Sequence, residues 1–137
     1  MAYVLPEDVR VFMMDRTPSE NFLLDALEFT DDEINTAMVL TVDKYNATPP
    51  LVDFYTSESF PYRYELLLGA SSTLLKMKAT NSMRNNLNYQ TSDGVAIDDK
   101  AKRQEYFQLA QANDAEFMQR IKALKVSKNA EACYGYV

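Results

Sequence analysis

The chain has 137 residues, of which 20 are acidic and 14 are basic, and it contains no histidine, no tryptophan and a single cysteine. This length fits one domain, and an apolar content of 47% is typical of a folded protein. The acidic balance argues against a free-standing nucleic-acid binder. Because histidine is the most common general base, its absence argues against nucleophilic catalysis. We therefore expect no enzymatic activity and no cofactor.

Neither secretion nor membrane insertion is expected. The N-terminal MAYVLPEDVR lacks the basic and apolar regions of a secretory signal. No apolar run approaches the roughly 20 residues that a membrane-spanning helix needs. Cys133 has no partner for an internal disulfide, which fits synthesis in a reducing compartment.

The charge is unevenly divided along the chain. Residues 1–60 hold 12 acids and 3 bases, a balance of −9, whereas residues 61–137 hold 8 acids and 11 bases, a balance of +3. One interpretation is that the fold has two differently solvated faces. The other is that copies of the protein attract one another head to tail, which would set orientation and encounter rate more than affinity.

The N-terminal third predicts two short helices. Pro6 opens the first, which continues to about Met14 and places Val9, Phe12 and Met13 on one face. Thr17 and Glu20 form a capping signal around Pro18 for the second. Its apolar face would consist of Leu23, Leu24 and Leu27.

Thr30 and Glu33 repeat the capping signal, and the helix that they open has the cleanest apolar period in the chain. Its expected buried face is Ile34, Ala37, Met38, Thr41, Val42 and Tyr45. The helix is expected to end near Asn46, because two prolines follow. Residues 47–60 then form a connector, with Phe54, Tyr55 and Phe60 as its expected anchors.

Residues 61–85 predict a central helix that is apolar on most sides and is therefore buried. Its apolar residues are Tyr64, Leu67, Leu68, Leu74, Leu75 and Met77. The small residues from Gly69 to Ser72 lie in the middle of this helix. Glycine costs about 1 kcal/mol of helix propensity, so we expect close approach of another helix to compensate for it.

A short β-hairpin or extended loop is expected near residues 88–97. Asn88 to Gln90 and Val95 to Ile97 flank Asp93 and Gly94, a dipeptide that favours a tight hairpin turn. Such short arms are marginal unless they dock on another surface.

The last expected helix begins at Asp98 and Asp99 and ends near Val126. Its apolar stripe would be Tyr106, Leu109, Ala110, Phe117, Ile121 and Leu124, and its charged coat would be Lys100, Lys102, Arg103, Glu105, Glu116, Arg120, Lys122 and Lys125. The remaining residues lose the period. The expected organisation is therefore an all-α domain, residues 1–126, of about four to five helices in a small bundle, with an extended tail over residues 127–137.

Few residues indicate chemistry. The acid pairs Asp31–Asp32 and Asp98–Asp99 lie at helix starts, where capping and the helix dipole account for them. They lack the histidine or cysteine companions of a zinc site, and we expect no metal. The basic cluster Lys100, Lys102 and Arg103 beside Tyr106 and Phe107 could contact a phosphate backbone, although a solvated helix face is the preferred interpretation.

Much of the sequence resembles the head-to-tail adaptor, or head-completion, proteins of tailed bacteriophages. The resemblance is carried by PSENFLLDALEFTDDEINTAMVLTVDKYNATPP (18–50), FPYRYELLLGASSTLL (60–75) and MRNNLNYQTSDGVAIDD (83–99). It extends through the charged helix and the tail. The first 16 residues lie outside it.

This resemblance implies a structural virion protein of the neck, present in the host cytoplasm during assembly. It implies a homo-oligomeric ring, commonly of about twelve copies, that binds the portal, extends the DNA channel and joins head to tail. DNA would pass through the ring without sequence-specific binding. The implied portal-binding residues are Val126, Lys128, Asn129, Cys133, Tyr134, Gly135, Tyr136 and Val137. The implied channel or next-ring residues are Asn88, Tyr89, Asp93, Gly94, Val95 and Ile97.

Two alternatives remain at this point. The chain could be another neck or tail-completion protein, which the identity of its partner would decide. It could also be a helical DNA-binding or regulatory module that uses the helix from Asp98 for recognition, although the acidic charge argues against this.

Overall fold

The computed structural model describes residues 4–17, 27–84, 88–90, 96–98 and 100–133. This part holds four helices: α1 (Pro6–Met13), α2 (Asp31–Ala47), α3 (Arg63–Arg84) and α4 (Lys100–Cys133). It also holds two short antiparallel strands, β1 (Asn88–Gln90) and β2 (Ala96–Asp98). The all-α class is confirmed, and the four helices are compatible with a small bundle. The helix expected from Pro18 lies mostly outside the described residues.

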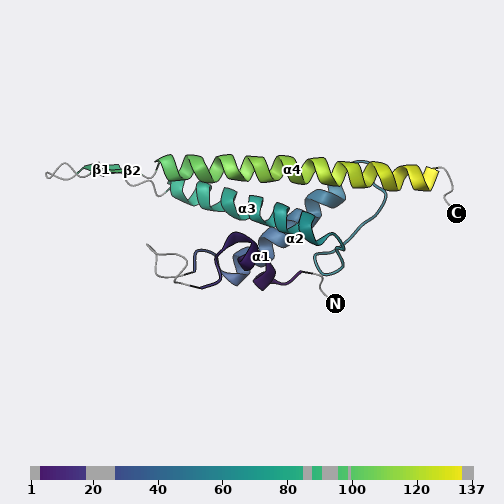
Figure 1. The fold of residues 1–137 in the computed structure, drawn as a ribbon, viewed down its shortest axis with the longest axis horizontal. Helices are drawn as coiled ribbons and strands as arrows, with labels where there is room; N and C mark the ends of the chain where they lie inside the picture. The colour runs from purple at the N-terminus through teal and green to yellow at the C-terminus, as the bar shows by residue number, and fades with distance from the viewer. Residues whose placement is uncertain (1–3, 18–26, 85–87, 91–95, 99, 134–137) are drawn as a thin grey trace.

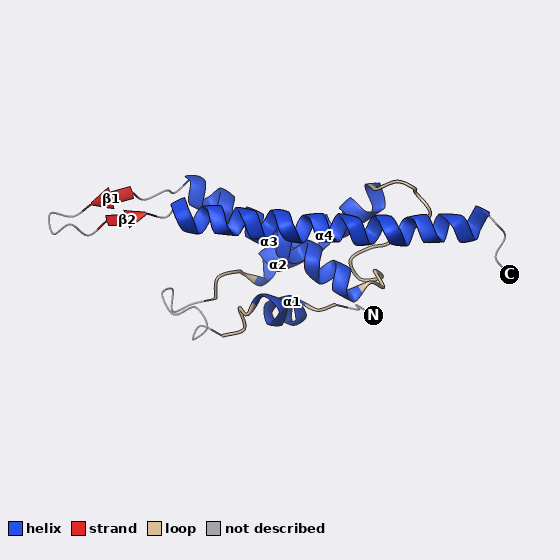
Figure 2. Cartoon of the chain, turned by 45° about the horizontal axis from the view of Figure 1, so that its top comes forward, coloured by secondary structure: helices blue, strands red, loops and turns tan. Residues whose placement is uncertain are grey.

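The antiparallel pair of α3 and α4 forms the frame of the molecule (Figure 1). The 34 residues of α4 correspond to a rod of about 50 Å, whereas the 22 residues of α3 span about 33 Å. As a result α4 continues past the N-terminal end of α3. Helices α1 and α2 also pack on α3 (Figure 2), and the C-terminal half of α2 reaches α4 as well, where Lys44 pairs with Asp114.

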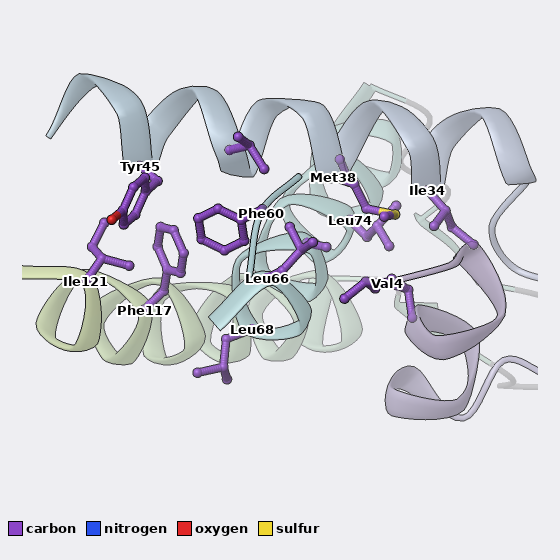
Figure 3. Packing of buried hydrophobic residues seen from close by; sticks show 14 of the residues in the cluster. Val4, Ile34, Met38, Tyr45, Phe60, Leu66, Leu68, Leu74, Phe117 and Ile121 are labelled. Atoms are coloured by element: carbon purple, nitrogen blue, oxygen red, sulfur yellow. The ribbon is translucent and has the colours of Figure 1, made fainter. Parts of the chain in front are cut away.

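Helix α2 follows the sequence pattern closely. The Glu33 backbone N–H donates to Thr30 Oγ1 at 3.2 Å, and the Thr30 N–H donates to Glu33 Oε2 at 3.4 Å, so the expected capping box is confirmed. All six residues of the expected face are buried. These residues contribute to a core with residues of α3 and α4, among them Leu66, Leu74 and Phe117 (Figure 3).

Close helix packing at Gly69 is also confirmed. A Cβ atom on Gly69 would lie 2.2 Å from Thr41 Cγ2 on α2 and 3.2 Å from Phe117 Cδ2 on α4. The missing side chain therefore lets α3 fit between the other two helices. Ser72 strengthens the contact with α4, since its hydroxyl donates to the Ala110 carbonyl at 2.8 Å.

A buried carboxylate connects α1 to the start of α2. Met14 ends α1 in the left-handed region, with φ of 58°, and this turns Asp15 into the protein. Asp15 accepts hydrogen bonds from the backbone N–H groups of Glu28 (2.9 Å) and Phe29 (3.0 Å), and it pairs with Arg10 at 3.2 Å. The buried charge is thus hydrogen-bonded on several sides, as such groups require.

The expected extended tail is wrong for residues 127–133, because α4 continues through Val126 to Cys133. The expected boundary at residue 126 therefore falls inside a helix. Alanine, lysine and glutamate dominate this stretch and favour helix, while Asn129 costs less than about 1 kcal/mol. Residues 134–137 lie outside the described part.

Several side chains lie elsewhere than expected. Lys125, expected in the charged coat, is fully buried. Leu109, expected in the buried stripe, is exposed, because the face of α4 that packs on the core centres on Ala110, Phe117 and Ile121. Tyr64 is also exposed, and its ring stacks on the Arg120 guanidinium at 4.6 Å. Phe54, an expected anchor, is 77% exposed, because Asp53 and Tyr55 on either side of it point inward instead.

Candidate functional site

The two predicted contact regions lie at opposite ends of the molecule. Figure 1 shows β1 and β2 beyond one end of the helical frame and the C-terminal end of α4 beyond the other. The view turned by 45° shows the same separation (Figure 2). The predicted portal-binding and channel residues therefore do not form one site. They are two candidate interfaces joined by α4.

At the C-terminal end, four of the predicted portal-binding residues lie on the last turns of α4. Val126 is 61% exposed, and Asn129 and Cys133 are exposed as well. Lys128 differs, because its side chain points back into the protein. The other four, Tyr134, Gly135, Tyr136 and Val137, lie outside the described residues.

At the opposite end, the strands lie within the segment for which a hairpin or an extended loop is expected. Asn88 and Tyr89 belong to β1, and Ile97 belongs to β2. The register pairs Tyr89 with Ile97 and Asn88 with Asp98. The other predicted residues here, Asp93, Gly94 and Val95, lie outside the described part.

A group that we call the tyrosine–lysine cluster holds the C-terminal part of α4 against the connector between α2 and α3. It consists of Tyr45, Asp53, Tyr55, Phe60, Tyr62, Lys125 and Lys128. Lys128 Nζ forms an ion pair with Asp53 and donates to Tyr55 Oη at 3.0 Å. The same nitrogen lies 4.8 Å from the ring centre of Tyr62 and 5.1 Å from that of Tyr55. Lys128 is thus occupied within its own chain.

The aromatic side chains of the cluster contact one another mainly edge to face. The Tyr45 and Phe60 ring centres are 5.0 Å apart, and those of Phe60 and Tyr62 are 5.4 Å apart. The Tyr45 hydroxyl donates to Asp53 Oδ1 at 2.9 Å. Such pairs add about 0.5–1.5 kcal/mol each beyond their burial, so the connector is firmly fixed here.

Lys125 is the second cation of the cluster and the more deeply buried one. Its Nζ donates to the Thr48 carbonyl at 2.6 Å and lies 4.3 Å from the Tyr45 ring centre. No carboxylate among the described residues forms an ion pair with it. A carbonyl oxygen and an aromatic face therefore replace the water that a lysine normally binds.

Ionisation within the cluster is shifted by these contacts. Burial alone would raise the pKa of the Asp53 carboxyl, but hydrogen bonds from Lys128 and Tyr45 outweigh it, and the pKa lies below its ordinary value of 3.8. Burial would lower the pKa of Lys128, yet its hydrogen bond to Asp53 raises it above 10.5. Lys125 lacks such a partner, and burial lowers its pKa below 10.5.

These shifts predict how acid affects stability. Because the pKa of Asp53 is lowered on folding, its stabilising contribution is complete above pH 3.8 and is lost as the pH falls through the lowered value. We expect Asp53→Asn to cost about 1–2 kcal/mol near neutral pH and progressively less below 3.8. Urea unfolding across this pH range measures the difference.

The matched control for this prediction is Glu58→Gln, which neutralises an exposed carboxylate on the same connector. We expect Glu58→Gln to change the free energy of unfolding by less than about 0.5 kcal/mol. A cost of Asp53→Asn that stays constant through the acid range would contradict the assignment of the low pKa to Asp53.

Some of the opposite charges of the two halves of the sequence pair with each other within one chain. Among the described residues, three ion pairs join the acidic half (1–60) to the basic half (61–137), namely Asp8–Arg63 (3.0 Å), Lys44–Asp114 and Asp53–Lys128. In two of them the acid comes from the acidic half. The halves of one subunit therefore attract each other, and only the charges left over are available to a second molecule.

Sequence reasoning missed most of the tyrosine–lysine cluster. The sequence pattern predicts that Tyr45, Tyr55 and Phe60 are buried. It does not predict burial of Tyr62 or of the charged residues of the cluster, Asp53, Lys125 and Lys128. The available signal was helical spacing, because Lys125 and Lys128 follow Phe117 by eight and eleven residues and Ile121 by four and seven, which continues the same helical face. Lysine at such a position is ordinarily taken for a solvent-exposed residue.

The described residues include no group of three or more potential metal ligands. Among the described helices, none combines the length and apolar character needed to cross a membrane. Comparison with models of protein families, with curated proteins and with solved structures finds no match to this chain.

Proposed function

We propose that this protein is a structural subunit of the neck of a tailed bacteriophage, an adaptor that forms a ring on the portal and joins head to tail. The resemblance carried by residues 18–50, 60–75 and 83–99 motivates the proposal. The observation that supports it best is the placement of the two candidate interfaces at opposite ends of the α3–α4 frame. An adaptor needs two such separate ends, because it contacts a different partner at each.

The exposed residues at the C-terminal end suit a docking role. Val126, Asn129 and Cys133 are exposed on the last turns of α4. Lys128 contributes to the proposed docking indirectly, since its ion pair with Asp53 fixes the direction of α4 at this end. The portal-binding surface is therefore proposed to comprise one face of the end of α4 together with residues 134–137.

The acidic character of the chain fits a DNA channel. A net charge of −6 gives passing DNA few cations to neutralise its phosphates, and such neutralisation is the main source of tight DNA binding. DNA would then slide through the ring. The hairpin end of the subunit is proposed to face the channel or the next ring.

Counting this chain in purified virus particles tests the function. We expect roughly a dozen copies per particle, measured by quantitative mass spectrometry against the major capsid protein. Absence from the particles would eliminate the adaptor proposal and favour a DNA-binding role. Presence together with cross-links to the tail tube, rather than to the portal, would favour a tail-completion protein.

Truncation tests the portal-binding end. A chain that ends at Cys133 is expected to lose portal association in a pull-down assay while keeping its helical circular dichroism. Val126→Asp should weaken the association, because it places a charge on an exposed apolar contact. Truncation after Val126 is a poorer test, since it also removes Lys128 from Asp53.

The control for both variants is Lys122→Ala on the exposed surface of α4, which should leave portal association unchanged. Full portal binding by the chain that ends at Cys133 would show that residues 134–137 are not part of the docking surface.

A further inference from the structure

A groove with an apolar floor and two basic residues runs between α2 and α3. Its volume is about 350 Å³, and its lining is Leu40, Thr73, Lys76, Met77, Thr80, Asn81 and Arg84. Leu40 is 46% exposed, although it is a leucine in the middle of a packed helix. Exposed apolar surface of this kind, bordered by polar residues, is typical of interaction sites.

The two cations of the groove have no acidic partner among the described residues. Lys76 and Arg84 are both exposed, and neither forms an ion pair with the described part of the chain. By contrast Arg10, Lys44, Arg63, Arg120 and Lys128 all bind carboxylates within the subunit. The charge of the groove is therefore available to another molecule.

The outer face of α2 has the opposite charge. Thr36, Val39 and Asp43 follow Asp32 by four, seven and eleven residues, and all four side chains are exposed. Val39 is 46% exposed and lies between the two carboxylates. We call these four residues the acidic stripe.

The start of α2 accounts for only part of the acidic stripe, because the helix dipole favours Asp32 whereas Asp43 lies in the second half of the helix. Of the three acids in the first turn of α2, Asp31 binds Arg10 at 2.7 Å and Glu33 completes the capping box. Asp32 and Asp43 make no such contact with described residues. The stripe thus has two unpaired negative charges on either side of an apolar residue, just as the groove has two unpaired positive charges beside an apolar floor.

We propose that the groove binds the acidic stripe of a second copy of this chain. The cations are eight residues apart on α3, about 12 Å along the helix axis, and the carboxylates are eleven residues apart on α2, about 16 Å. Lysine and arginine side chains are long enough to cover the difference. Val39 would then pack against Leu40 and Met77, and the ion pairs would fix its orientation.

This proposal rests on the proposed function for its biological setting, a ring, and it specifies which surfaces meet there. Each copy carries both surfaces, so a head-to-tail contact leaves one of each free to continue the assembly. A nucleic-acid occupant is disfavoured, because the apolar floor of the groove, Leu40 and Met77, matches an apolar side chain such as Val39 and offers nothing to a phosphate backbone.

Charge reversal on each surface tests the pairing. Each variant is named after the wild-type surface that it changes. The basic variant replaces the two cations of the groove (Lys76→Glu with Arg84→Glu), and the acidic variant replaces the two carboxylates of the stripe (Asp32→Lys with Asp43→Lys). In low-salt buffer we expect the wild-type chain to self-associate in sedimentation velocity and each variant to associate at least about tenfold more weakly. An equimolar mixture of the two variants should associate again, because every contact between unlike copies regains opposite charges.

Two controls accompany the charge reversals. Lys122→Glu on the exposed surface of α4 makes the same change as Lys76→Glu outside the groove and should leave association intact. Asp43→Lys alone keeps the first turn of α2 unchanged and replaces the acidic variant if that variant unfolds. The proposal fails if the wild-type chain stays monomeric, if both variants associate normally, or if their mixture remains dissociated.

The outcomes separate this inference from the proposed function. Particles that contain the chain and still incorporate the basic variant at the normal copy number would disprove the interface and leave the adaptor function standing. Restored association of the mixed variants, with no copies found in particles, would support the interface and disprove the function. Loss of binding to a duplex DNA probe by the basic variant, with a monomeric wild-type chain, would assign the groove to nucleic acid instead.

Discussion

Replacement of Lys125 by alanine is expected to lower the free energy of unfolding by about 2–5 kcal/mol, the range for truncating a large buried side chain. The substitution empties the space beneath the Tyr45 ring and removes the donor to the Thr48 carbonyl. A buried carbonyl without a donor adds about 1–3 kcal/mol to the cost of a cavity. Urea denaturation followed by circular dichroism measures the effect.

Lys125→Met separates packing from charge in this prediction. Methionine keeps most of the side-chain volume and avoids burying an ammonium group, so we expect a cost below about 1.5 kcal/mol. Lys122→Ala, on the exposed surface of the same helix, should cost less than about 0.5 kcal/mol. An equal effect of Lys125→Ala and Lys122→Ala would show that Lys125 is not buried in solution.

The pH dependence of Lys125 gives a second readout. Burial lowers its pKa on folding, so the folded protein loses this proton before the unfolded chain does. Between the lowered value and 10.5 the unfolded state binds more protons, and the contribution of Lys125 to stability rises with pH. Lys125→Met should remove this contribution, whereas that of Lys128, whose pKa is raised, is lost only at higher pH.

Replacement of Gly69 by alanine is expected to destabilise the protein by about 1–3 kcal/mol. Helix propensity alone would make the same change stabilising by about 1 kcal/mol. The steric effect should dominate, because the new Cβ would lie 2.2 Å from Thr41 Cγ2. Thr41 cannot rotate freely, since its hydroxyl donates to the Ala37 carbonyl at 2.7 Å.

A second substitution checks this explanation of Gly69. Thr41→Ser removes Cγ2 and keeps the hydroxyl, so Gly69→Ala should cost less in the Thr41→Ser background. A double-mutant cycle gives the coupling energy, for which we expect about 1 kcal/mol or more. Additive effects of the two substitutions would place the steric conflict elsewhere, for instance at Phe117.

The sequence predicts α2 well because local physics determines that helix. The capping box and the prolines after Asn46 set its ends to within about two residues. Its six buried residues follow from a regular apolar period. Gly69 was likewise interpretable, since a helical glycine without a packing reason is costly.

The end of α4 and the burial of Lys125 depend on contacts between distant parts of the chain. Thr48 and Asp53 are 77 and 75 residues from the lysines that they bind. Helical period locates a face but does not reveal what covers it. A lysine on that face was therefore assigned to solvent, and the helix was ended where its apolar residues stop. Val39 and Leu40 fall between the buried positions of α2, so the period places them off the core face but does not show what, if anything, covers them.

The uninterrupted length of α4 has a mechanical consequence. Force applied at its C-terminal end passes along consecutive backbone hydrogen bonds to Lys100, the first residue of α4, without crossing a loop. The tyrosine–lysine cluster holds α4 near its C-terminal end, and the contact with α3 holds the rest of the helix. These contacts are expected to make α4 resist bending. We therefore expect a push on one end of α4 to reach its other end as a displacement, because no hinge interrupts the helix.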